Sequence, residues 1–274
     1  MTEMLKRVLL VCLPLALLAA CSSPAPPRPP AVLESANNAD QQARRALRDG
    51  DFPVARNLFE QSLRLQQSLD NLPGIASAAI NLAAVYHAMN NDDVALSLLD
   101  GILADRLAPY PADLRAVAAF RKAVILVDGK NKDAPAAVEA AAQLCASSCE
   151  FKAGLYNLRA RMALGSQDYA AAASQAKLAA DASGDDKEEL ANARRHSGAA
   201  SFALGQPGPA LEHYLAALEL DKQLGAPRRI AEDLRGASVA LDRLGRKDEA
   251  ASYARRAAAA HDAIQPGAGA ARAP

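Results

Sequence analysis

The sequence contains no tryptophan, and aromatic residues make up only 4% of its 274 residues. A core filled with aromatic rings is therefore excluded, and the abundant alanine and leucine must fill narrow gaps between closely packed helices. The net charge is zero, and no block of lysine and arginine marks a surface that would follow a phosphate backbone. We expect an all-α protein that does not bind nucleic acid.

Patterns typical of catalytic and metal sites are also missing. The four histidines, His87, His196, His213 and His261, occur without a metal-ligand spacing such as H-E-x-x-H. Glycines such as Gly205 belong to turns, and the sequence contains no nucleophile paired with a base and no phosphate-binding loop. We therefore predict no enzymatic activity, no metal, no cofactor and no small-molecule substrate.

The one long apolar run lies at the start of the chain. Val8 to Ala20 carries no charge, follows Lys6 and Arg7, and with thirteen residues is too short to cross a bilayer. A spanning helix needs about 20 residues to cross the hydrocarbon core. The pattern predicts that residues 1–20 are a secretory signal peptide.

The apolar run ends in Leu18-Ala19-Ala20-Cys21, which resembles the lipobox of bacterial lipoproteins. The resemblance implies that Cys21 becomes the lipidated N-terminus, so that several acyl chains anchor the protein to a membrane. Because Ser22 stands where an aspartate would retain a lipoprotein in the inner membrane, the resemblance implies an outer-membrane protein facing the periplasm. The alternative is an ordinary signal peptide cleaved near Ala20, with Cys21 incidental.

The predicted helical region is flanked by two segments without apolar periodicity. Residues 21–35 begin with Cys21 and the proline-rich stretch SSPAPPRPPA, which predicts an extended linker. Residues 265–274, QPGAGAARAP, are predicted to be a disordered tail.

Cysteine is scarce, with four in the chain. If Cys12 leaves with the signal peptide and Cys21 carries lipid, Cys145 and Cys149 remain as a pair in an oxidising compartment. Residues four apart in a helix have Cα atoms about 6 Å apart, within disulfide range, and a turn brings them closer. We predict a disulfide. A redox pair or half of a metal site is the alternative, but the C-x-x-C spacing and a nearby histidine are missing.

A helical hairpin recurs about every 40 residues. In Gly198–Ala217, a turn at Gly205 is followed by Ala210, Tyr214 and Ala217, which lie on one helical face. Similar turns are predicted at 50–52, 90–92, 128–131, 167–169 and 245–247, followed by the small residues Ala55, Ala95, Ala136, Ala172 and Ala250. Six hairpins are therefore predicted.

In this spacing of small and aromatic residues the chain resembles the tetratricopeptide repeat family over residues 36–264, and its 40-residue unit resembles a long-helix variant of that family. The resemblance implies an α-solenoid of about six helical hairpins that forms a right-handed superhelix with a concave inner face. The alternative is an irregular helical bundle in which the alanines only look periodic.

In this family the first helix of each hairpin lines the concave face. The resemblance therefore implies a peptide-binding groove formed by Ile80, Asn81, Ala84, His87, Asn157, Arg195, His196, Phe202 and Arg235. We place Asn81 and Asn157 at equivalent positions, where an amide either holds a peptide backbone or satisfies a neighbouring helix. Asp40 and Arg44 stand where the carboxylate-binding clamp of the family needs lysine and asparagine, so that clamp is not predicted.

These features together predict a lipid-anchored scaffold of the Gram-negative envelope. Its groove would bind segments of other envelope proteins and so assemble or regulate a complex in pilus, secretion, outer-membrane assembly or peptidoglycan machinery. The alternative is a scaffold that binds a glycan during export, although the chain has no tryptophan on which a sugar could stack.

Overall fold

The computed structural model describes residues 30–104, 110–145 and 149–263, which form twelve α-helices and no strand. The predicted signal peptide, Cys21 and the predicted tail lie outside these residues. The helices are α2 (Ala31–Arg48), α3 (Phe52–Ser68), α4 (Leu72–Ala88), α5 (Asp92–Ala104), α6 (Ala112–Asp128), α7 (Ala134–Leu144), α8 (Lys152–Gly165), α9 (Tyr169–Ala182), α10 (Lys187–Ala203), α11 (Pro207–Leu224), α12 (Pro227–Arg243) and α13 (Lys247–Ala263).

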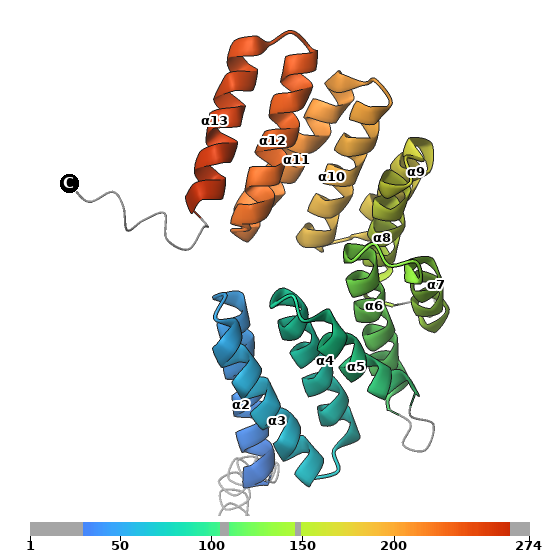
Figure 1. Ribbon diagram of the computed structural model, residues 1–274, viewed down its shortest axis with the longest axis vertical. Coiled ribbons are helices and arrows are strands. Elements are labelled where there is room, and N and C mark those ends of the chain that lie inside the picture. Colours follow the sequence, from blue (N-terminus) through green and yellow to red (C-terminus); the bar gives the residue numbers. More distant parts are fainter. Residues whose placement is uncertain (1–29, 105–109, 146–148, 264–274) are drawn as a thin grey trace, which may run out of the picture.

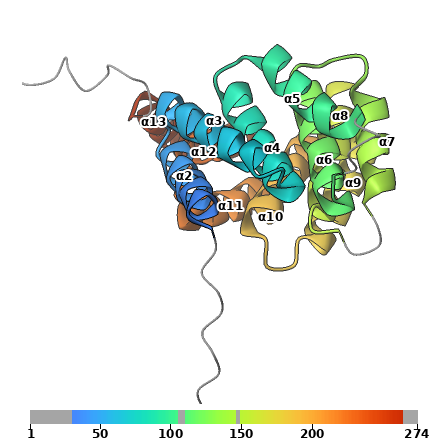
Figure 2. The same ribbon diagram turned by 90° about the horizontal axis from the view of Figure 1, so that it is seen from below.

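The helices form six hairpins that follow a curved path, so the predicted α-solenoid is confirmed (Figure 1). The path bends so strongly that α2 and α3 lie on the same side of the molecule as α12 and α13, with α6 to α9 opposite (Figures 1 and 2). From the second hairpin onward each first helix contacts the next, in the series α4, α6, α8, α10 and α12. These first helices form the inner layer of the curve, while α7 and α9 lie on its outer side (Figure 1).

The turn inside each hairpin has the same backbone geometry in all six copies. One residue of each turn has a positive φ, which glycine adopts without steric cost and which reverses the chain after a helix. The next N–H then donates to a carbonyl five residues earlier, as from Asp51 to Ala46 at 2.8 Å and from Gln206 to Ser201 at 2.9 Å. The positive-φ residues are Gly50, Asn90, Lys130, Gln167, Gly205 and Gly245.

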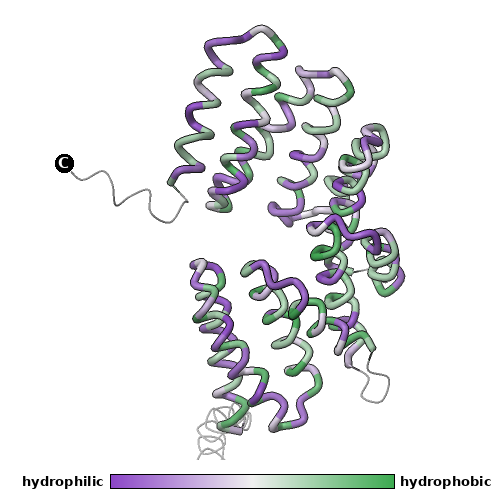
Figure 3. The backbone as a smooth tube through the Cα atoms, viewed as in Figure 1, coloured by the Kyte–Doolittle hydropathy of each residue, from purple (hydrophilic) through white to green (hydrophobic). Residues whose placement is uncertain are grey.

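Alanine fills the space between the two helices of each hairpin. Ala55, Ala95, Ala172 and Ala210 are completely buried, and each lies five residues after the positive-φ residue of its turn. A methyl side chain allows the two backbones to approach closely, which explains the small residue at this place. Hydrophobic and hydrophilic residues alternate along most of the helices (Figure 3). Most of the buried residues are hydrophobic.

The third hairpin departs from the predicted pattern. The prediction placed its small packing residue at Ala136, but Ala136 is exposed, and Ala134, Val138 and Ala141 are buried instead. The Asn131 side chain accepts a hydrogen bond from the backbone N–H of Asp133 at 2.9 Å, which forms a local turn before α7. This turn shifts the buried face of α7, and at 11 residues α7 is the shortest of the twelve helices.

The first helix begins earlier than the sequence suggested. Residues 21–35 were predicted to be an extended linker, but α2 starts at Ala31, directly after Pro30. A residue before proline avoids helical geometry, whereas a helix can begin immediately after the last proline of a series. Glu34 in the first turn also suits the positive end of the helix dipole.

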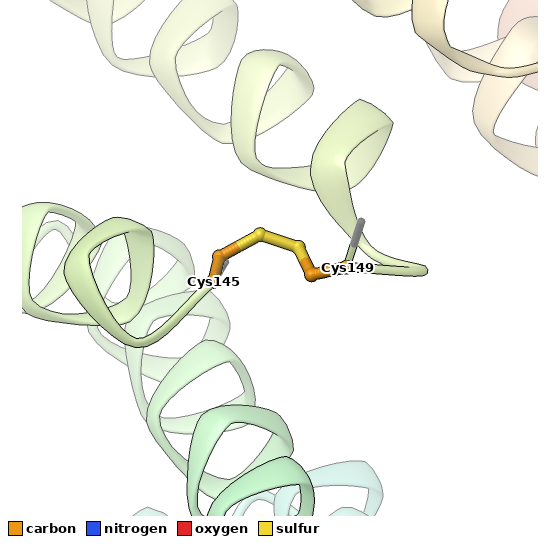
Figure 4. The surroundings of a disulfide bond; sticks show 2 residues. All are labelled: Cys145 and Cys149. Carbon is orange, nitrogen blue, oxygen red and sulfur yellow. A yellow bond between two sulfur atoms is a disulfide. The ribbon is translucent and has the colours of Figure 1, made fainter. Parts of the chain in front are cut away.

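A disulfide bond joins Cys145 to Cys149, with their Cα atoms 5.2 Å apart (Figure 4). Cys145 ends α7, and Cys149 precedes α8, so the bond connects the third hairpin to the fourth. Helices α7 and α8 pack against each other less extensively than any other consecutive pair in the described part of the chain. The covalent link therefore lies at the junction with the least packing.

Candidate functional site

A cleft of about 500 Å³ crosses α6, α8, α10 and α12, the first helices of four consecutive hairpins. Its walls are mainly charged. They contain Arg121, Arg161, Arg195, Arg228 and Arg229 together with Asp128, Glu188, Glu189 and Glu232. Because the cleft spans four helices, it is long enough for an extended segment to contact several repeats at once.

The structure divides the predicted groove residues into three groups. Asn157, Arg195 and His196 line the cleft. Phe202 and Arg235 line a smaller cavity of about 300 Å³, which Arg195 also lines. Ile80, Asn81, Ala84 and His87, all on α4, line neither the cleft nor this cavity. The predicted groove is therefore not one continuous surface.

On α4, two of the predicted residues serve the fold. Ile80 is only 5% exposed and packs in an apolar cluster with Leu99, so its assignment to the groove surface is wrong. Asn81 is half-buried and donates from Nδ2 to Asp40 Oδ1 at 3.3 Å, which links α4 to α2. Of the two roles proposed for this amide, the structure shows the contact with a neighbouring helix. The small side chain of Ala84 is half-buried.

Asn157 does not occupy the position equivalent to Asn81, so this prediction is wrong. Ala95 follows Asn81 by fourteen residues, whereas Ala172 follows Asn157 by fifteen. A shift of one residue rotates a side chain by about 100° around a helix with 3.6 residues per turn. Asn157 is consequently buried, with only 5% of its surface exposed.

The amide of Asn157 connects α8 to α10. Its Nδ2 donates to the backbone carbonyl of Glu189 at 2.9 Å and to Glu189 Oε2 at 2.7 Å. Its Oδ1 is buried and has no hydrogen-bond partner among the described residues. A buried acceptor of this kind is normally satisfied by a water molecule or a ligand.

Arg195 is the centre of a buried ionic network between α10, α11 and α12. Its side chain is 11% exposed, and its Nε donates to Asp233 Oδ1 at 2.7 Å while Nη2 donates to Asp221. Both aspartates are completely buried. Burial raises the pKa of Asp233 and the nearby Asp221 raises it further, whereas Arg195 lowers it, and the net effect is a raised pKa.

His196 lies among arginines in the cleft. Burial lowers its pKa, and the positive charges of Arg195, Arg161 and Arg229 lower it further, to about 3. The imidazole is therefore neutral at neutral pH, with one ring nitrogen able to donate and the other able to accept a hydrogen bond.

His87 connects two neighbouring hairpins outside the cleft. Its Nδ1 lies 2.7 Å from Asp92 Oδ1, and its Nε2 lies 3.0 Å from Asp128 Oδ2. Burial lowers the pKa of His87, but hydrogen bonds with Asp92 and Asp128 outweigh that effect and raise it overall. Asp128 also contacts Arg161 Nη1 at 2.5 Å, so a polar chain links α4, α6 and α8.

Residues 35–104 match the family model of the tetratricopeptide repeat. This part of the chain therefore has the sequence of tetratricopeptide repeats. The crystal structure of BtubC (BKLC) from P. vanneervenii is similar to 90% of this chain and 96% of its own, with 16% sequence identity and a TM-score of 0.52. At this identity the similarity concerns the fold.

A second solved structure, of putative kinesin light chain nearly identical TPR-like repeats from Podosopora anserina, has a TM-score of 0.35 and 15% identity, covering 84% of this chain and 96% of its own. No curated protein matches the sequence. Because the family is built from repeats that bind other proteins, the repeat protein described here has the fold of a protein-interaction scaffold.

Two residues of the site were missed from the sequence: Arg161 lines the cleft, and the buried Asp221 holds the cleft residue Arg195. Arg161 follows Asn157 by one helical turn and therefore shares its face of α8, a spacing that could have revealed it. Asp221 continues the face formed by Ala210, Tyr214 and Ala217, where a charge at a buried position was itself a signal.

Two kinds of feature are absent from the described residues of the repeat protein, a metal-binding cluster and a membrane-spanning helix. These residues contain no group of three or more His, Cys, Asp or Glu side chains placed to hold a metal ion. No helix among them is both long and apolar enough to cross a membrane.

Proposed function

We propose that this tetratricopeptide-repeat protein is a lipid-anchored scaffold of the Gram-negative envelope that holds segments of other envelope proteins in the cleft between α6 and α12. The observation that carries the proposal is the cleft itself, which spans four consecutive first helices and is lined by charged side chains. Holding a segment there would assemble or regulate a larger envelope complex.

Two features support the proposed location. The pattern Leu18-Ala19-Ala20-Cys21 places a cysteine directly after an uncharged apolar run, as lipid attachment requires. The disulfide between Cys145 and Cys149 suits an oxidising compartment such as the periplasm, because cytosolic thiols are kept reduced. The lipid on Cys21 would hold the scaffold at the outer membrane, with the repeats facing the periplasm.

Labelling with a palmitate analogue in a Gram-negative host tests the anchor. We expect the wild-type chain to incorporate the label and Cys21→Ser to lose it. Cys12→Ser is the matched control, because Cys12 lies in the predicted signal peptide, and it should label like wild type. Labelling of Cys21→Ser at the wild-type level would contradict the lipid anchor.

Site-specific photo-crosslinking in the same host tests the cleft. A photoreactive amino acid replaces Arg121 or Arg228, two exposed residues at the edge of the cleft, or Lys177, an exposed residue of the outer helix α9. We expect discrete protein adducts from positions 121 and 228 and none of the same size from position 177. The same adducts from all three positions, or none from the cleft, would contradict binding of protein segments there.

A further inference from the structure

A second cavity, of about 730 Å³, lies between the third and fourth hairpins. Its walls come from the end of α6, the turn that follows, the start of α7 and the end of α8, and we call it the α7–α8 cavity. Of the residues that line it, Asp128 and Arg161 also line the cleft. Because the other walls belong to the two turns and to α7, which lies on the outer side of the curve (Figure 1), the cavity lies mainly outside the cleft.

The α7–α8 cavity exists because these two helices pack loosely. The disulfide between Cys145 and Cys149 joins the end of α7 to the start of α8 (Figure 4). The cavity lies at the opposite ends of the same helices, where α7 begins at Ala134 and α8 ends at Gly165. Alanine and glycine have little or no side chain with which to fill this space, so it stays open.

Apolar side chains form the inner wall of the α7–α8 cavity, and polar side chains form its rim. Val127 and Ala134 are buried, and the half-buried Met162 packs against the cluster that contains them. Lys130 and Ser166 are exposed. The volume falls within the range of about 300–1,000 Å³ for cavities that hold small ligands, and a mainly apolar wall with a few polar groups is typical of them.

The inner wall offers no hydrogen-bonding group to a ligand. The carbonyl of Val127 accepts from the N–H of Lys130 at 3.2 Å, and the carbonyl of Met162 accepts from the N–H of Ser166 at 2.9 Å. An extended peptide in this cavity would bury its own N–H and C=O groups without partners, which is unfavourable. An acyl chain has no such groups, and its burial against apolar side chains is favourable.

The charged side chains that line the cavity are mainly cationic: Lys130, Arg159 and Arg161, with Asp128 as the one carboxylate. Asp128 lies 2.5 Å from Arg161 Nη1, and Arg159 pairs with Glu139 at 3.2 Å. Lys130 makes no ion pair within the described part of the chain, so its positive charge at the rim favours an anionic group. Asp128 repels a dianion more strongly than a monoanion, which favours a carboxylate over a phosphate group.

We infer that the α7–α8 cavity binds a long-chain fatty acid, with the acyl chain against the inner wall of Val127, Ala134 and Met162 and the carboxylate beside Lys130 at the rim. This site goes beyond the proposed function, because it holds a lipid and not a protein segment. Either proposal can fail without the other.

Photolabelling of the full chain in isolated envelopes tests this site. Envelopes of the Gram-negative host are washed free of ATP and coenzyme A, so that the probe is not activated and transferred to proteins. They then receive a palmitic acid analogue with a diazirine in its acyl chain, and peptide mapping by mass spectrometry locates the adducts. We expect adducts in residues 127–135 and 159–166. The methyl ester of the analogue should need up to about 5-fold more probe for half-maximal labelling, the range for an exposed charge pair.

Three variants examine the cavity and its rim. A Cβ on Gly165 would have nothing within 4 Å, so Gly165→Leu places a side chain in the cavity without a clash and should raise the half-maximal concentration about 10-fold or more. Gly101→Leu is the matched control, because Gly101 is an equally open helix position that does not line the cavity, and it should label like wild type. Lys130→Gln should make the acid label like its ester.

Circular dichroism confirms that each variant is folded, and Met162→Trp fills the cavity in a second way if Gly165→Leu is not. Unchanged labelling in a folded filling variant, adducts spread equally over α9 and α13, or no adducts in wild type would overturn the site. An ester that labels as well as the acid would overturn the role of the carboxylate. Stronger labelling of the cavity by a diazirine phospholipid with two acyl chains would overturn the assignment to a fatty acid. The crosslinks from positions 121 and 228 test the cleft separately.

Discussion

The first two hairpins and the last two both contain buried apolar clusters, but they differ in the charged side chains that they bury. In α2 to α5 the fully buried positions include Phe59, Leu99 and Val85, which pack in apolar clusters. In α10 to α13 they include Asp221 and Asp233, which hold Arg195. The family model matches only residues 35–104, within the apolar half. The last two hairpins also supply α10 and α12 to the wall of the cleft, whereas the first two hairpins supply none of its residues.

This difference has a physical consequence. Burying apolar side chains stabilises a repeat directly, whereas buried charges are stable only while every partner is present. The C-terminal half should therefore tolerate changes to its ionic network poorly, and its stability should depend on pH. Four measurements test this contrast between the halves.

The largest effect is expected for Arg195→Met. The change leaves Asp221 and Asp233 buried without their cation, which should lower the free energy of unfolding by about 3–5 kcal/mol. Urea denaturation measures the loss, and hydrogen exchange should place it in α10 to α13. The control is Arg246→Met, whose exposed pair with Glu249 is screened by water and should change the stability far less. Equal losses of stability in the two variants would contradict the difference between the buried network and an exposed ion pair.

The second effect concerns acid. The pKa of His196 is about 3 in the fold and about 6.5 in an unfolded chain, so the unfolded state binds the extra proton between these values. The contribution of the neutral imidazole to stability is fully present above pH 6.5. Below that pH the free energy of unfolding falls by about 1.4 kcal/mol for each pH unit. Relative to wild type, His196→Gln should gain about 2 kcal/mol between pH 6 and pH 4 in urea titrations. Parallel pH profiles would refute this.

A third measurement compares two glycines. A Cβ on Gly236 would lie 2.5 Å from the Tyr214 ring, which packs between α10 and α12, so Gly236→Ala should destabilise the C-terminal half by about 1–3 kcal/mol. In the N-terminal half, Gly101 in α5 has nothing within 4 Å of such a Cβ, and Gly101→Ala should stabilise by up to about 1 kcal/mol. Thermal unfolding measures whether each variant is stabilised or destabilised. A stabilised Gly236→Ala would show that the Tyr214 ring moves away without cost.

The smallest effect is expected at His87. Its folded pKa is raised, so its contribution is present below about pH 6.5 and is lost as the pH rises through the folded pKa. Because the side chain is 28% exposed, we expect wild type to lose less than about 1 kcal/mol on this rise. His87→Gln should show no such step in urea titrations. A step of unchanged size in the variant would assign it to another group.

The architecture was accessible from the sequence because its signals are local. The turns at Gly50, Gly205 and Gly245 each combine a flexible residue with an alanine five positions later, and the structure has a turn at each. The turn of the third hairpin was predicted, but its small packing residue was misplaced at Ala136 because a side-chain hydrogen bond of Asn131 decided where the second helix begins. Such a bond leaves no periodic trace in the sequence.

The cleft was only partly accessible. Arg195 and His196 were assigned from their place on a first helix, but Asn157 was taken as the equivalent of Asn81 although the two differ by one residue in register. Arg161 has two buried nitrogens, Nε and Nη2, without a hydrogen-bond partner among the described residues, and this depends on which side chains lie near its guanidinium in space. Contacts between helices about 30 residues apart, such as Asn157 with Glu189, cannot be read from local patterns.

The bond between Cys145 and Cys149 also has a mechanical consequence. In a stack of repeats, stiffness comes from the contact between neighbours, and the contact between α7 and α8 is the smallest along the described chain. The array therefore resembles two stiff arms that meet at a joint, and the disulfide limits how far that joint can open under load. A pull on one arm then acts on the disulfide, which holds the two Cα atoms 5.2 Å apart, before the backbone between the two cysteines can extend.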